Sequence, residues 1–177
     1  TMPNLPFLLA YATSSLRWPS WAIGVMAALS HICNCLQPAF SRFLQRRWSL
    51  HTIMRGGFII SGITWFCIGL SSFLPGMAAH AAFAVLLTIA TMANSVTSVA
   101  WSAAISEVVP VRISGTYFGR RNLIFGAWTL IAVLTAGKIV ELAGGATVAF
   151  AAIFAASGLA RLLGLFFLQK MKFPAGV

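Results

Sequence analysis

Two long stretches without any formal charge, residues 56–106 and 142–160, constrain this chain more than any other feature. A helix that crosses about 30 Å of hydrocarbon needs roughly 20 mostly apolar residues. Each interval between basic clusters is long enough for two such helices and a tight turn, and cations that return after every second helix fit the positive-inside rule. The sequence therefore predicts an all-α polytopic membrane protein. Nine of the twelve basic residues form the three clusters: Arg42, Arg46, Arg47 and Arg55; Arg112, Arg120 and Arg121; Lys170 and Lys172.

The composition supports a membrane protein and argues against a nucleic-acid-binding protein. Hydrophobic residues make up 59% of the chain, charged residues only 8%, and the mean hydropathy is +0.90. Soluble domains carry about a quarter of their residues as charged types. The net charge of +10 arises because Glu107 and Glu141 are the only acids in the sequence. We expect the basic residues to meet anionic lipid at the inner membrane surface, and we expect no nucleic-acid partner.

Apolar runs and turn signals predict a single transmembrane domain over residues 1–177 with six helices. Pro19, Pro75 and Pro110 end or start helices, and Gly144-Gly145 forms a turn. The first apolar run covers only about 16 Å as a helix. We therefore interpret it as the second half of a truncated helix and the chain as a fragment. The expected spans are 5–15 (partial), 20–40, 56–74, 79–106, 122–142 and 146–168.

The distribution of basic residues predicts the orientation. Nine cations lie in or beside the loops that would share one side, whereas only Arg17 and Lys138 lie at the other side, and Arg161 falls inside the last span. By the positive-inside rule, both ends and both arginine-rich loops are cytoplasmic. The expected location is the cell inner membrane, with Arg161 either reaching the inner interface or facing protein.

One loop carries a family signal. Residues 101–122 read WSAAISEVVPVRISGTYFGRRN, in which an acid, a hydrophobic pair, a proline, a basic residue and a glycine precede an aromatic–Gly–Arg–Arg–Asn string. This string resembles the loop between the fourth and fifth helices of bacterial major facilitator superfamily (MFS) transporters, although a generic basic membrane loop is the alternative. The matching residues are Glu107, Pro110, Arg112, Gly115, Tyr117, Phe118, Gly119, Arg120, Arg121 and Asn122.

The resemblance implies an MFS-like six-helix half bundle, namely the N-terminal half of a protein that normally has twelve helices. Such a protein is a secondary active transporter that carries a small-molecule solute by alternating access. The implied partner is the missing C-terminal six-helix half, and no cofactor, metal or catalytic residue is implied. Separately, the residues themselves predict a mobile connector over Pro110–Gly119, with a positive φ at Gly115.

Polar residues inside two predicted spans are candidates for a substrate cavity. On the fourth span their spacings of three and four place them on one helical face. In the superfamily that this chain resembles, the fourth helix lines the central cavity; the alternative is hydrogen bonding between helices. His31 on the second span is a candidate for proton coupling, or else a hydrogen-bonded residue at a helix contact. The cavity candidates are Thr91, Asn94, Ser98 and Trp101 on the fourth span and Asn34 and Gln37 on the second.

Two other classes of function are weaker readings of the sequence. An intramembrane protease needs a serine activated by a histidine, but Gly57–Gly62 lacks a tight Gly-x-Ser-Gly turn and His31 and His80 lie far apart. A channel or scaffold subunit lacks support because the sequence shows no filter-like loop or charged ring. The three cysteines do not have metal-binding spacing. We therefore predict a transporter that is not an enzyme.

Overall fold

The structure is a computed structural model that describes residues 5–170, apart from the side chains of residues 5, 6, 30 and 107. Lys172, in the third basic cluster, lies outside the described residues. Within this part of the chain every regular element is an α-helix, which confirms the predicted all-α fold. The helices are α1 (Leu5–Ser14), α2 (Ser20–Gln45), α3 (Leu50–Ser71), α4 (Gly76–Val108), α5 (Val111–Leu142) and α6 (Thr147–Lys170).

Five of these helices, α2 to α6, are long and apolar enough to cross a membrane. The sixth, α1, has 10 residues and ends before the turn that leads to Pro19. Several helices extend beyond the predicted spans, because their ends carry the polar and basic residues that the sequence pattern assigned to loops. For example, α2 continues through Arg42 to Gln45, and α3 already begins at Leu50.

The predicted connector between α4 and α5 is wrong. α4 ends at Val108 and α5 begins at Val111, so that only Val109 and Pro110 join them. Proline lacks an N–H group, but the first turn of a helix needs no such donor, so Pro110 starts α5 without interrupting it. Gly115 and Gly119 lie inside α5, and Gly115 does not have the positive φ that we predicted. The described glycines with positive φ are Gly76, the first residue of α4, and Gly144 and Gly145, which lie in the α5–α6 turn.

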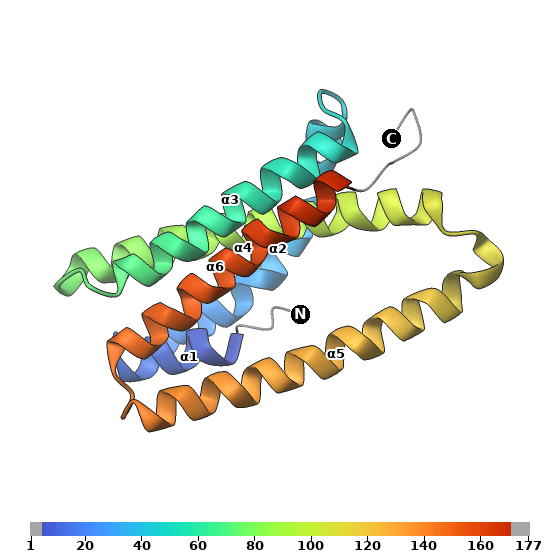
Figure 1. Cartoon of the computed structure of the whole chain (residues 1–177). Coiled ribbons are helices and arrows are strands. Elements are labelled where there is room, and N and C mark those ends of the chain that lie inside the picture. Colours follow the sequence, from blue (N-terminus) through green and yellow to red (C-terminus); the bar gives the residue numbers. More distant parts are fainter. Residues whose placement is uncertain (1–4, 171–177) are drawn as a thin grey trace.

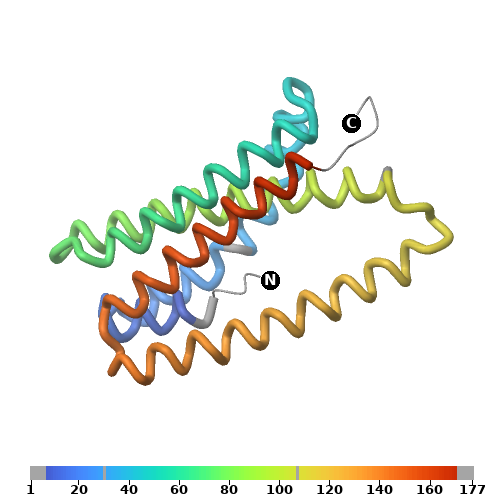
Figure 2. Tube along the Cα trace, in the orientation of Figure 1, coloured from blue at the N-terminus to red at the C-terminus, as the bar shows by residue number. Residues whose placement is uncertain are grey.

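Four helices form the packed part of the molecule, with α3 in contact with both α4 and α6, and α2 lying against α4 (Figure 1). The short α1 contacts α2 and α6. Its Tyr11 is buried in an aromatic cluster, with ring centroids 5.3 Å from Phe83 and 5.5 Å from both Phe150 and Phe154. α5 differs from the other long helices, because none of its described residues is buried and it runs apart from the bundle over much of its length (Figure 2).

The helices place the basic residues mainly at one end of the bundle. The α2–α3 turn, the α4–α5 turn and the end of α6 lie together at the right of Figure 1, whereas the α3–α4 and α5–α6 turns lie at the left. The first end carries Arg42, Arg46, Arg47, Arg55, Arg112 and Lys170, and the opposite end carries Arg17 and Lys138. Arg120, Arg121 and Arg161 lie farther inside α5 and α6. Basic clusters that are far apart in the sequence therefore lie at the same end of the bundle, and this end is more positively charged than the opposite end.

Candidate functional site

A polar pocket lies among α3, α4, α5 and α6, with a volume of about 770 Å³. α3 contributes a small residue, Gly57, and a hydroxyl, Ser61, whereas α4 contributes most of the polar lining. The lining residues are Gly57, Phe58, Ser61, Asn94, Thr97, Ser98, Trp101, Arg121, Asn122, Phe125, Ser157, Ala160 and Arg161. Hydroxyl, amide, indole and guanidinium groups therefore converge inside an otherwise apolar set of helices.

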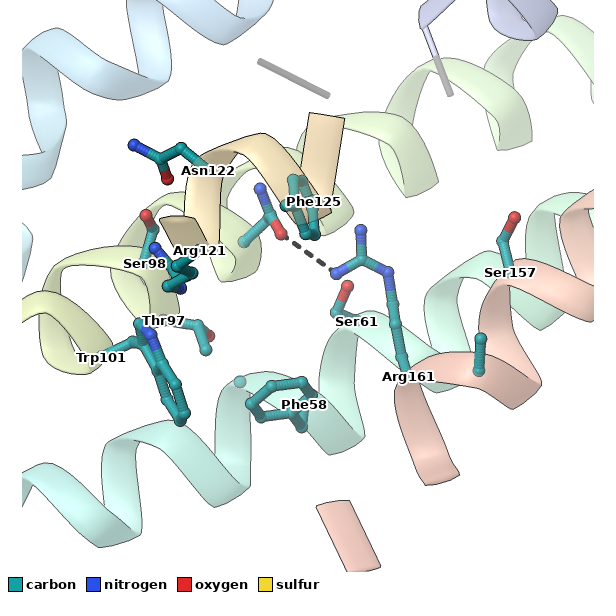
Figure 3. Close-up of a pocket in the computed structure, with 13 residues that line it drawn as sticks. Phe58, Ser61, Thr97, Ser98, Trp101, Arg121, Asn122, Phe125, Ser157 and Arg161 are labelled. Atoms are coloured by element: carbon teal, nitrogen blue, oxygen red, sulfur yellow. Dashed lines mark hydrogen bonds between the residues drawn. The ribbon is translucent and has the colours of Figure 1, made fainter. Parts of the chain in front are cut away.

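Arg161 is the central charge of this pocket. Its side chain extends from α6 toward Ser61 on α3, and its Nη1 donates a 3.0 Å hydrogen bond to Asn94 Oδ1 on α4 (Figure 3). The guanidinium carbon also lies 5.8 Å from the ring centroid of Trp65, a buried residue of α3. Arg161 lies nine residues before Lys170, the last residue of α6, which corresponds to about 13.5 Å along a helix axis. Arg161 therefore lies well inside a helix that is long enough to cross a membrane about 30 Å thick.

Two further polar atoms of the pocket are buried without a hydrogen-bond partner among the described residues. They are Ser61 Oγ and Trp101 Nε1. Leaving a buried polar group unpaired costs about 1–3 kcal/mol, so such groups in native structures usually have a partner. A serine hydroxyl can donate or accept, whereas an indole N–H can only donate. The pocket therefore offers donors that the protein itself leaves unused.

Gly57 determines how closely α3 approaches α4 at the pocket. A Cβ atom at this position would collide with the Thr97 hydroxyl, whose Oγ1 donates a 2.6 Å hydrogen bond to Ala93 O. Glycine thus lets α3 approach α4 closely at the pocket.

The structure brings together three of the four candidates that we predicted on α4. Asn94, Ser98 and Trp101 line the pocket. Thr91 lies about one turn earlier on α4, is buried, and donates a 2.7 Å hydrogen bond from Oγ1 to Leu87 O; it is not among the lining residues. That these residues contact substrate stays a prediction, but their shared face is a property of the structure.

The candidates on α2 lie elsewhere. Asn34 Oδ1 accepts a 3.1 Å hydrogen bond from Ser95 Oγ, and Gln37 Nε2 donates a 2.8 Å bond to Ser95 O. Both contacts join α2 to α4, as expected for polar residues between membrane helices. His31 is exposed on α2. None of these three side chains lines the polar pocket.

The residues of the family-like string divide between α4, the two-residue connector and α5. Arg121 and Asn122 line the polar pocket, whereas Tyr117 and Arg120 border a smaller hollow on α5 together with Arg121. The rings of Tyr117 and Phe118 pack edge to face, with centroids 5.4 Å apart. Arg112, Gly115 and Gly119 are exposed in the first turns of α5, and Glu107 belongs to the last turn of α4.

The sequence analysis did not select Ser61, Gly57, Thr97 or Arg161 as site residues. Arg161 carried a usable signal, because an ionisable residue inside an apolar helix usually serves a function. Ser61 and Thr97 carried none, since small hydroxyl residues also occur wherever membrane helices pack.

Comparison of the chain with known protein families, with curated proteins and with solved structures finds no match.

Proposed function

We propose that the chain is the N-terminal six-helix half of a secondary active transporter of the MFS type, which carries a small solute across the cell inner membrane by alternating access. The observation that carries this proposal is the polar pocket near the middle of apolar helices, lined by Asn94, Ser98, Trp101 and Arg161. Polar and ionisable groups at membrane depth mark substrate or ion pathways. In secondary transporters the binding site lies near the midplane, where two helical units meet.

The family-like string of residues 101–122 supports the same proposal independently of the pocket. It lies at the junction of α4 and α5, and its Arg121 and Asn122 border the pocket. The charge difference between the two ends of the bundle supports cytoplasmic placement of the α2–α3 and α4–α5 turns. The second half of the transporter would then complete the solute pathway.

Accessibility of Ser98 to water tests this proposal. In the complete transporter with its native cysteines replaced, Ser98→Cys should react with a small hydrophilic thiol reagent. The extent of labelling should differ between inside-out and right-side-out vesicles, and it should change when the transported solute is present.

Thr88→Cys is a matched control on the same helix. Thr88 is exposed like Ser98 but lies beside a groove of almost entirely apolar side chains, so the hydrophilic reagent should react poorly there. Labelling of Ser98→Cys from neither side, in any condition, would show that the polar face serves packing alone and would overturn the proposal.

A further inference from the structure

The charges that border the polar pocket have one sign. Its lining includes two guanidinium groups, Arg121 and Arg161, and none of its lining residues is an aspartate or glutamate. A guanidinium stays protonated in proteins, so each group contributes a full positive charge. The two cations come from different helices, α5 and α6, so positive charge borders the pocket from two sides.

Along the described helices, neither glutamate of the sequence lies close to Arg161. Of its two acids, Glu141 accepts a 2.9 Å hydrogen bond from Lys138 Nζ near the end of α5. Glu107 lies on the same helix as Asn94 but thirteen residues later, a separation of about 20 Å along the axis. Asn94, which does contact Arg161, supplies a neutral amide oxygen. The protein therefore orients this cation without cancelling its charge.

The unused hydrogen-bonding groups of the pocket favour an acceptor. Arginine has five N–H donors, and one nitrogen of Arg161 is directed to Asn94. Trp101 Nε1 can only donate, and it is buried without a described partner; Ser61 Oγ, on a side chain that is 1% exposed, is in the same condition. Donors from three helices and a net positive charge match a ligand that carries negatively charged oxygens.

We propose that the solute bound in this pocket is a small anion with a carboxylate or phosphate group, and that Arg161 binds it with help from Trp101 and Ser61. This inference rests on the proposed transport function for its physiological meaning, but the binding site can be tested separately. Asn94 and Trp65 hold the Arg161 side chain in place, so that the anion meets an oriented guanidinium. Arg121 adds charge at the α5 side of the pocket.

Binding by the complete protein can be measured in nanodiscs of neutral phosphatidylcholine. Thermal unfolding is followed with succinate or inorganic phosphate, and with glucose or choline chloride, all at equal ionic strength. We expect at least one of the two anions to raise the Tm, and glucose and choline to leave it unchanged. Arg161→Gln should weaken anion binding about tenfold or more, because it removes a charged hydrogen-bond donor.

Two further variants separate loss of binding from loss of folding. Trp101→Phe keeps the ring and all charges but removes the indole N–H, so it should weaken binding of the same anion several-fold without lowering the Tm of the free protein to a similar degree. Arg55→Gln removes one positive charge from an exposed position on α3 outside the pocket and should bind the anion normally. No Tm increase with either anion, or equal binding in the wild type, Arg161→Gln and Trp101→Phe, would overturn the inference.

A lipid headgroup offers the same phosphate chemistry, so a second set of nanodiscs contains phosphatidylglycerol. Stabilisation by this lipid alone, with no response to soluble anions in neutral discs, would mean that the pocket is a lipid site and would overturn the inference. The transport proposal has its own readout, the two-sided labelling of Ser98→Cys. Labelling of Ser98→Cys from both sides without anion binding would support the transport proposal and overturn the anion-binding inference. Anion binding without labelling from both sides would support the anion site and overturn the transport proposal.

Discussion

At the scale of single residues, the position of Arg161 depends on contacts from two neighbouring helices. Placing an arginine near the centre of a membrane helix costs about 2.5–3.5 kcal/mol on insertion scales. A hydrogen bond to a charged group contributes about 1.5–3 kcal/mol. The bond to Asn94 and the nearby ring of Trp65 can therefore offset much of this cost. Arg161 is consequently tied to α3 and α4, not to α6 alone.

The first prediction concerns this bond. Asn94→Leu should destabilise the protein by about 1.5–3 kcal/mol, because it leaves the guanidinium without its amide partner. Thermal unfolding of the purified protein in detergent, without added anions, measures the change. The double variant Asn94→Leu/Arg161→Met should recover part of the loss, because it removes the unpaired charge as well. A loss in the double variant that equals the sum of the losses in Asn94→Leu and Arg161→Met alone would show that the two side chains do not interact.

At the scale of elements, close approach of backbones determines how α3 packs on α6. A Cβ at Gly158 would lie 2.7 Å from Gly62 O and 3.1 Å from the nitrogen of Phe66. A Cβ at Gly69 would lie 3.0 Å from Ala151 O. These neighbours are backbone atoms that cannot move aside alone. Small residues at such crossings are the usual means by which membrane helices approach each other.

The second prediction tests this crossing. Gly158→Ala should destabilise the protein by about 1–3 kcal/mol through overpacking, seen as a lower Tm and less monodisperse protein after heating in detergent. Gly126→Ala on α5 is the control, since a Cβ there meets nothing within 4 Å. It should be neutral or stabilising by up to about 1 kcal/mol, because alanine favours a helix over glycine. A neutral Gly158→Ala would mean that α3 and α6 are farther apart than the structure places them.

The third prediction follows from the continuous helix at the start of α5. Gly115 lies inside α5 in open space, so Gly115→Ala should stabilise the protein by up to about 1 kcal/mol. Gly144 also has open space around it but adopts φ +60° in the α5–α6 turn. Gly144→Ala should therefore cost about 1–2 kcal/mol from backbone strain alone. Measurements of Tm for both variants check these values. A lower Tm for Gly115→Ala would contradict the continuous helix and favour the flexible connector that the sequence predicted.

At the scale of the whole molecule, the helical spacing of polar residues predicted which residues share one face of a helix, but it did not predict which neighbouring helix that face contacts. Helical spacing on α4 placed Asn94, Ser98 and Trp101 on one face, and they do share the pocket. The same reasoning grouped Asn34 and Gln37, but the rotation of α2 about its axis directs them to Ser95. Rotation and partner choice depend on packing between helices, which a single sequence does not encode locally. For the same reason the contact between Arg161 and Asn94, 67 positions apart, had no local signal.

The α5 helix shows a further limit of local patterns. Pro110, Gly115 and Gly119 are common in loops, and the sequence interpretation gave them to a connector. A helix nevertheless accommodates a proline at its start without loss of a hydrogen bond. Each of the two exposed glycines lowers helix stability by about 1 kcal/mol relative to alanine. The surrounding helix, more than 30 residues long, supplies enough hydrogen bonds to absorb that cost.

The last prediction concerns the orientation of the whole bundle. Six described basic residues lie at or near the end that holds the α2–α3 and α4–α5 turns, against two at the other end, so the first end should face the cytoplasm (Figure 1). In a protein whose native cysteines are replaced, Thr116→Cys reports on the first end and Ala143→Cys on the second. Both residues are exposed, so each cysteine can reach a reagent. In intact cells an impermeant maleimide should label only Ala143→Cys, and after the membrane is permeabilised it should label both. Labelling of Thr116→Cys in intact cells would reverse the orientation, and with it the side from which the solute first meets Arg121.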